Sequence, residues 1–95
     1  MANIRSIKKD IHFLTDEVVS DCYVYIYLNP GKKTEAAEKI ALESEAFRNA
    51  AIDKVNNPGK FENAKLRKAY FKGLYEELIT EVNKQFEQLS ALSKN

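Results

Sequence analysis

The four-residue sequence Asn-Pro-Gly-Lys occurs twice in this chain of 95 residues, at positions 29–32 and 57–60. The two copies contain both prolines and two of the three glycines. Proline presets the backbone for the first corner of a turn and glycine accepts the positive φ of the second, so each copy predicts a turn that ends the preceding element. The chain is thereby divided into three segments, 3–28, 34–56 and 62–93.

Apolar side chains recur every three or four residues in each segment, which is the period of an amphipathic helix. The three stripes are Ile4, Ile7, Ile11, Leu14, Val18, Cys22 and Tyr25; then Ala37, Ile40, Ser44, Phe47, Ala51 and Val55; and finally Phe71, Leu74, Leu78, Val82, Phe86, Leu89 and Leu92. Thr34 is a suitable N-cap for the second helix. Because short connections make successive helices antiparallel, we predict an all-α, up-down-up three-helix bundle formed by residues 1–95 as one domain.

Two features leave alternatives open. The run Cys22–Leu28 alternates tyrosines with β-branched and aliphatic residues, which is typical of a strand. No second strand-like run exists to pair with it, so a helix is the favoured interpretation. Gly73 lies inside the third stripe and costs a helix about 1 kcal/mol relative to alanine. It could mark a close helix crossing, a merely exposed position, or a break that makes the bundle four-helical.

Several short motifs resemble a family of short, uncharacterised bacterial helical proteins. They are Ile7-Lys8-Lys9-Asp10-Ile11, Asp21-Cys22-Tyr23, Asn56-Asn57-Pro58 and Leu89-Ser90-Ala91-Leu92. The resemblance covers most of the chain and implies a helical fold. Because that family has no known activity, the resemblance implies no functional residue.

The charge and cysteine content restrict the class of protein. Fifteen basic residues nearly balance 14 acidic ones, so a net charge of +1 gives no overall attraction to nucleic acid or to an anionic membrane. A single cysteine cannot form an intrachain disulfide, which favours a reducing, cytoplasmic location. The apolar stretch Cys22–Leu28 is far shorter than the roughly 20 residues of a membrane-spanning helix, and no apolar core of a signal peptide follows the charged start of the chain.

The residues that could carry chemistry are few. His12 has Asp16 one helical turn later, which could support general-base chemistry or half of a metal site. The sequence offers no accompanying nucleophile and no further ligand set, so His12 is expected on the surface. Cys22 lies on the apolar stripe and is expected to fill the core, and Asp21 beside it is expected to be partly buried and hydrogen-bonded. We therefore expect no enzyme activity, no cofactor and no metal.

The first segment is apolar on two sides. Phe13, Tyr23, Val24 and Tyr27 project away from its core stripe, and a helix that is apolar all round has to be covered all round. Tyrosine suits a protein interface because it combines a large apolar area with a polar tip. We therefore interpret the protein as a self-associating interaction module, a homodimer in the simplest case. The alternative is that the third segment folds over this face.

A second function is suggested by the stretch 60–72, which holds five basic residues and one acid. Lys65, Lys68 and Lys72 share one helix face and could contact a phosphate backbone. The favoured interpretation is a solvated face that is balanced by Glu76, one turn after Lys72. A small nucleic-acid-associated protein is therefore the alternative to the interaction module.

Overall fold

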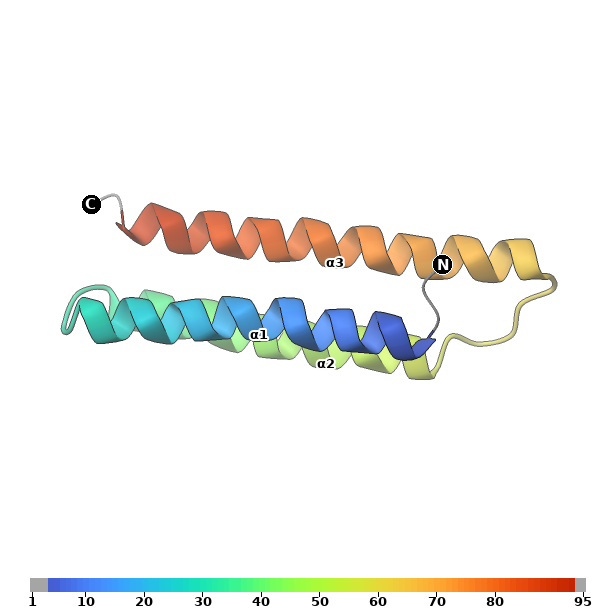
Figure 1. Ribbon diagram of the computed structural model, residues 1–95, viewed down its shortest axis with the longest axis horizontal. Coiled ribbons are helices and arrows are strands. Elements are labelled where there is room, and N and C mark those ends of the chain that lie inside the picture. Colours follow the sequence, from blue (N-terminus) through green and yellow to red (C-terminus); the bar gives the residue numbers. More distant parts are fainter. Residues whose placement is uncertain (1–3, 94–95) are drawn as a thin grey trace.

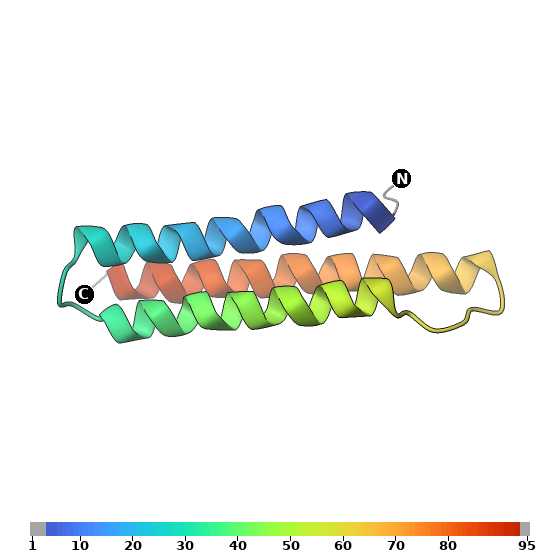
Figure 2. The ribbon, with the colours of Figure 1, turned by 90° about the horizontal axis from the view of Figure 1, so that it is seen from below.

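The computed structural model describes residues 4–93, of which 87% are helical. The helices are α1 (Ile4–Leu28), α2 (Thr34–Asn56) and α3 (Ala64–Ser93). They run along one long axis, with α3 lying against the pair formed by α1 and α2 (Figures 1 and 2). The bundle measures 53 × 19 × 18 Å. The predicted antiparallel three-helix bundle is confirmed.

Both open alternatives for the helices are resolved. Cys22–Leu28 is the last part of α1, so the strand interpretation is wrong, and burial of Cys22 and Tyr25 against the other helices outweighs the strand preference of this run. The helix α3 is continuous through Gly73, so the four-helix alternative is also wrong. A Cβ added at Gly73 would meet no atom within 4 Å, which shows that no helix crosses closely there.

The two Asn-Pro-Gly-Lys copies end their helices in the same way. The side-chain amide of Asn29 donates a 3.0 Å hydrogen bond to the carbonyl of Tyr25, and that of Asn57 donates a 3.3 Å bond to the carbonyl of Asp53. The glycines that follow have φ values of 77° and 85°, which glycine adopts without strain. The repeated sequence therefore serves one structural purpose, the ending of a helix.

The helix starts differ from the prediction. Thr34 is already the first helical residue, so its predicted role as N-cap is wrong. The cap position belongs to Lys33, which has a φ of 52°, and its carbonyl accepts a 3.1 Å bond from the Ala37 N–H. The third helix starts two residues later than predicted, because the side chain of Asn63 accepts a 2.9 Å bond from the Leu66 N–H and caps it.

Small side chains bring α1 and α2 together. Ala37 and Ala41 are buried on α2, and these two helices pack more closely than either packs against α3. The hydroxyl of Ser44 donates a 3.2 Å bond to the carbonyl of Thr15 on α1, and the hydroxyl of Thr15 donates a 2.7 Å bond to the carbonyl of Ile11. The apolar core consists of Ile7, Ile11, Val18, Cys22, Tyr25, Ala37, Ile40, Ala41, Ala51, Val55, Leu78, Val82 and Leu89.

The first half of α3 contributes little to this core. Its fully buried residues begin at Leu78, and none of residues 64–77 is buried. The first turns of α3 project beyond the neighbouring ends of α1 and α2 (Figures 1 and 2). Gln85 is the one buried polar residue of α3. Its Nε2 donates a 2.9 Å bond to Glu81, whereas its buried Oε1 has no hydrogen-bond partner among residues 4–93.

Candidate interaction surfaces

The outer face of α1 remains uncovered in the folded chain. Phe13, Tyr23, Val24 and Tyr27 are 61%, 54%, 51% and 83% exposed. The helix α3 does not cover them, so the alternative in which the third segment folds over this face is wrong. The four residues predicted as an interface are therefore available to a partner.

The helix geometry divides this set in two. A helix rises about 1.5 Å per residue, so Tyr23, Val24 and Tyr27 lie within little more than one turn of each other. Leu28 is 68% exposed and extends them. We call Tyr23, Val24, Tyr27 and Leu28 the tyrosine patch. Phe13 lies about 15 Å before this patch along α1. The sequence prediction omitted Leu28, although its position as the last residue of the apolar run was a usable signal.

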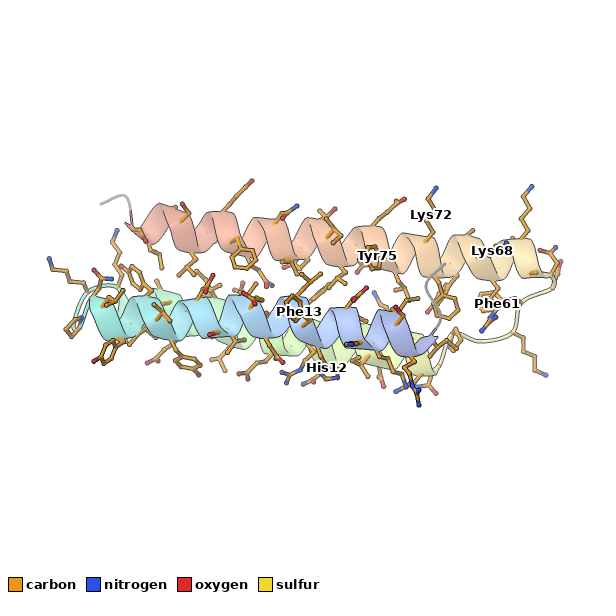
Figure 3. The ribbon with its side chains drawn as sticks, in the orientation of Figure 1. His12, Phe13, Phe61, Lys68, Lys72 and Tyr75 are labelled. Atoms are coloured by element: carbon orange, nitrogen blue, oxygen red, sulfur yellow. The ribbon has the colours of Figure 1, made fainter. Side chains whose placement is uncertain are left out.

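Phe13 lies on the side of the bundle where α1 and α3 run next to each other, as does Tyr75 of α3 (Figure 3). The Tyr75 hydroxyl donates a hydrogen bond to Asp10. The negative charge of Asp10, together with burial and this hydrogen bond, raises the pKa of Tyr75. Near the other end of the two helices, the Tyr25 hydroxyl lies 3.5 Å from the carbonyl of Leu92. These two contacts fix α1 and α3 as parallel neighbours.

The basic stretch lies on the projecting start of α3. Lys65, Lys68 and Lys72 are exposed, and Lys72 extends away from the bundle in Figure 3. Within residues 4–93 none of the three forms an ion pair, so the predicted balance of Lys72 by Glu76 is not a direct contact. The three amino groups are free to meet an anionic partner.

The aromatic residues near this stretch have a structural role. The ring of Phe61 lies 5.3 Å from that of Tyr70 and 6.4 Å from that of Phe71, and the Arg67 guanidinium lies 5.6 Å from the centre of the Phe71 ring. The Tyr70 hydroxyl donates a 2.9 Å bond to the carbonyl of Lys54 near the end of α2. This cluster, which sequence reasoning missed, ties the connection between α2 and α3 to the bundle.

The possible catalytic pair is not assembled. His12 is exposed (Figure 3), and the carboxylate of Asp16 lies 3.5 Å from the guanidinium of Arg48 on α2. Among residues 4–93, no three side chains of the histidine, cysteine, aspartate and glutamate type are grouped so that they could hold a metal ion. The arrangement therefore nominates no catalytic or metal-binding residue.

Cys22 is fully buried, as predicted. Burial, followed by the negative charge of Asp21, raises the pKa of the Cys22 thiol to about 11. Because the thiolate is the reactive form, this thiol is unreactive at neutral pH. The prediction that Asp21 is partly buried is wrong: it lies one residue before Cys22, a turn of 100° away from the core direction, and is exposed.

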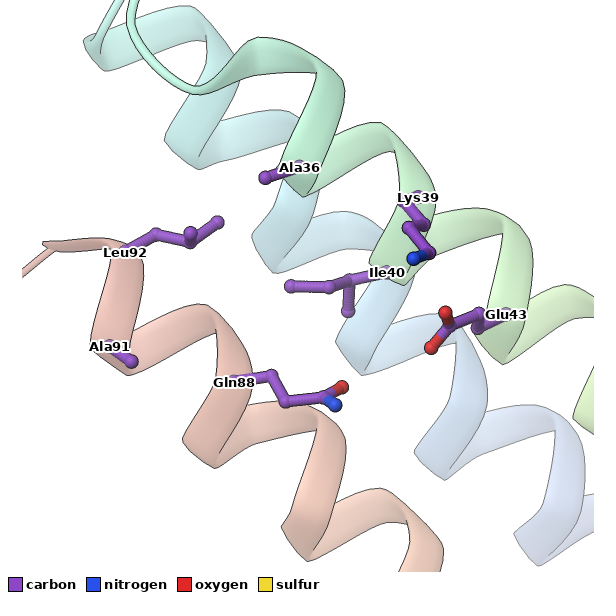
Figure 4. Close-up of a pocket in the computed structure, with 7 residues that line it drawn as sticks. All are labelled: Ala36, Lys39, Ile40, Glu43, Gln88, Ala91 and Leu92. Atoms are coloured by element: carbon purple, nitrogen blue, oxygen red, sulfur yellow. The ribbon is translucent and has the colours of Figure 1, made fainter.

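An open groove with a volume of ≈ 320 Å³ lies between α2 and α3 near the end of the bundle (Figure 4). It is lined by Ala36, Lys39, Ile40, Glu43, Gln88, Ala91 and Leu92. Ile40 and Leu92 form its apolar centre, and Lys39 and Glu43 lie along its α2 side. A shallow groove of this kind holds no convergent set of buried polar groups and does not resemble an active site.

No family model, curated protein or solved structure matches the chain. The resemblance to short bacterial helical proteins therefore stays a prediction. None of the helices within residues 4–93 is long and apolar enough to cross a lipid bilayer. The exposed surfaces of α1 and α3 are thus the candidate functional features of residues 4–93.

Proposed function

We propose that the protein is a non-enzymatic interaction module of the cytoplasm that self-associates through the outer face of α1. One observation carries this proposal: α1 keeps five large apolar side chains more than half exposed while its opposite face fills the core. Contiguous apolar patches of more than a few hundred Å² are uncommon on monomers and mark interaction surfaces. The tyrosine patch supplies three of the features of such a surface, namely aromatic area, a polar tip and the absence of charge.

The first test is the mass of the protein in solution. Sedimentation equilibrium at micromolar concentration should give a mass above the 10.9 kDa of one chain. Replacing both Tyr23 and Tyr27 by glutamate places charges in the apolar contact, so the doubly substituted protein should dissociate while its circular dichroism stays helical. The matched control is Leu42→Glu, which changes a similarly exposed apolar residue on α2. A native mass of 10.9 kDa, or an oligomer unaffected by the double substitution, contradicts the proposal.

A second candidate function is nucleic-acid binding by the start of α3. The observation that favours it is the exposure of Lys65, Lys68 and Lys72 without an acidic partner among the described residues. Binding through phosphate contacts falls steeply with salt. If the native protein retards DNA or RNA in a gel at physiological salt, and the variant with all three lysines replaced by glutamine does not, this second function replaces the first.

A further inference from the structure

Five exposed residues of α1 form a row with an ordered charge pattern. They are Arg5, Lys9, Phe13, Glu17 and Asp21, and each lies four residues after the one before. Residues four apart are neighbours on a helix surface, but each step of four also turns about 40° round the helix, so the inner three, Lys9, Phe13 and Glu17, are the ones that share one side of α1. Its two cations precede Phe13 and its two carboxylates follow Phe13 at the same spacings. Reversing the direction of the row therefore exchanges its positive and negative positions and leaves Phe13 in place.

This pattern is unfavourable within a single chain. Arg5 and Lys9 are like charges on neighbouring turns, as are Glu17 and Asp21, and both pairs repel. Arg5 also lies in the first turn of α1, where the helix dipole disfavours positive charge. Among residues 4–93 none of these four side chains forms an ion pair that would offset the repulsion. The row thus carries a charge arrangement that a partner of complementary charge would neutralise.

We propose that a second copy of the chain docks antiparallel along α1, with Phe13 of both copies meeting at a two-fold axis. Lys9 of each chain then faces the partner's Glu17. A two-fold interface requires that when one position contacts a second, the second also contacts the first. The row meets this condition because Lys9 and Glu17 are equally far from Phe13. This inference rests on the proposed self-association and specifies its direction and register.

The same register gives the tyrosine patch a place to bind. The patch lies 10 to 15 residues after Phe13, whereas α1 starts only nine residues before Phe13. The patch of one chain therefore extends past the start of the other chain's α1. There the start of α3 projects (Figure 1), and it exposes Leu66 and the free lysines. A tyrosine ring can pack against Leu66 through its apolar area, and it can hold a lysine ammonium group against the face of the ring.

The size of the face is sufficient for a stable dimer. A long face of the bundle measures 53 by 19 Å, and standard interfaces bury about 800 Å² on each partner. The face that holds α1 and the start of α3 is therefore large enough for a contact of that size. A parallel contact of the same size would place Lys9 beside the partner's Lys9 and the carboxylates beside each other, so the charges select the antiparallel direction.

The deciding experiment is a charge swap on the inner positions of the row. Lys9→Glu alone and Glu17→Lys alone each place like charges across the axis, so each should raise the dimer Kd at least tenfold in sedimentation equilibrium. The doubly substituted chain, Lys9→Glu with Glu17→Lys, restores opposite charges across the axis and should regain dimerisation to within about threefold of the native Kd. Lys84→Glu, an exposed charge reversal on α3 outside this face, is the matched control and should leave the Kd unchanged.

Unfolding of the single variants would not explain a loss of the dimer. Each single reversal replaces a like-charge neighbour pair of α1 by an opposite-charge pair, so the helix itself should gain rather than lose stability. Circular dichroism of each variant should show native helix content. A loss of dimer by either single variant therefore reports on the contact between the chains.

Zero-length carbodiimide cross-linking reads the register directly. Lys9 and Glu17 of one chain lie about 12 Å apart along α1, too far for an amide bond between their side chains. In an equimolar, exchanged mixture of isotopically light and heavy chains, about half of the cross-linked peptide pairs that join Lys9 to Glu17 should carry one light and one heavy partner. A pair joining only peptides of the same isotope would overturn the proposal.

The remaining outcomes separate this inference from the function on which it rests. An oligomer that persists in both single variants, or that the doubly substituted chain fails to restore, overturns the register while the self-association stands. A native protein of 10.9 kDa overturns both. If that monomer retards nucleic acid in a gel, the cations of the row and of α3 bind a phosphate backbone and not a second copy of the chain.

Discussion

The hydroxyl of Ser44 on α2 lies 3.2 Å from the main-chain carbonyl of Thr15 on α1 and donates a hydrogen bond to it. A side chain as short as serine can reach the backbone of a neighbouring helix only where the two helices are close. Both residues are fully buried. This contact therefore shows that α1 and α2 pack closely here, and it distinguishes this pair from the more loosely packed α3.

Replacing Ser44 should test that packing. Ser44→Ala removes one buried hydrogen bond and should lower the free energy of unfolding by about 0.5–1.5 kcal/mol. Ser44→Leu adds volume where none is available and should cost about 1–3 kcal/mol or more. Chemical denaturation measures both, with Ala50→Leu on the exposed side of α2 as the control for propensity. Equal stability of Ser44→Leu and the control would show that the two helices do not pack closely here.

Gly73→Ala should stabilise the protein. The added methyl group meets no atom within 4 Å, and alanine favours a helix interior over glycine by about 1 kcal/mol. A gain of a few tenths to about 1 kcal/mol in denaturant unfolding is expected. Gly59→Ala is the contrasting control: its φ of 85° strains any residue with a side chain, so stability should fall. A loss of stability in Gly73→Ala would mean that a partner packs against this position.

The sequence was sufficient to predict the helices because their signals are local. The two Asn-Pro-Gly-Lys copies end α1 and α2, and the helix bounds agree with the predicted ones to within two residues. Thr15 and Gln85 were missed as core residues because no local rule places a polar side chain inside. Their burial depends on how closely the helices approach, which is a property of the assembled bundle.

The candidate surface was partly predictable for a related reason. Helical periodicity showed that Phe13 and Tyr27 lie off the core stripe, but it could not show whether α3 covers them. The folded bundle establishes that they are exposed, because α3 leaves both side chains uncovered. The charge row centred on Phe13 is visible in the sequence. It can be interpreted as a contact surface only when the structure shows that all its members are exposed.

Gln85→Leu should stabilise the bundle. Within the described part of the chain the buried Oε1 of Gln85 has no hydrogen-bond partner, and an unsatisfied buried polar group costs about 1–3 kcal/mol. Leucine is similar in size, and Glu81, which loses its bond to Nε2, is only partly buried and can be hydrated. We expect a gain of about 1–2 kcal/mol in denaturant unfolding. A clear loss would indicate that the amide oxygen has a partner in solution, such as a bound water.

The buried thiol should make stability fall at high pH. The pKa of Cys22 rises from 9.0 in its ordinary environment to about 11 in the folded protein. The folded chain therefore holds the proton more tightly than the unfolded chain, so this contribution is complete below pH 9 and is lost as the pH rises towards 11. Denaturant unfolding from pH 8 to pH 11 should show a decline that is smaller in Cys22→Ala. Identical pH profiles for the two proteins would contradict the raised pKa.

The same thiol should resist modification. A disulfide reagent at pH 8 should react with native Cys22 only through opening of the structure, so the rate should increase by orders of magnitude when denaturant unfolds the chain. Rapid labelling of the native protein would show that the C-terminal half of α1 is accessible to the reagent.

Replacing Lys65, Lys68 and Lys72 together by glutamine should leave the fold intact. All three are exposed on the part of α3 that projects from the bundle, and none forms an ion pair within residues 4–93. Lys65 lies in the first turn of α3, where a cation opposes the helix dipole, so removal of the three charges should change the free energy of unfolding by less than about 1 kcal/mol and in the stabilising direction. Leu78→Ala, which truncates a buried residue of the same helix, should cost about 2–5 kcal/mol under the same conditions. If the triple variant loses as much stability as Leu78→Ala, the start of α3 is an integral part of the bundle rather than a surface available to a partner.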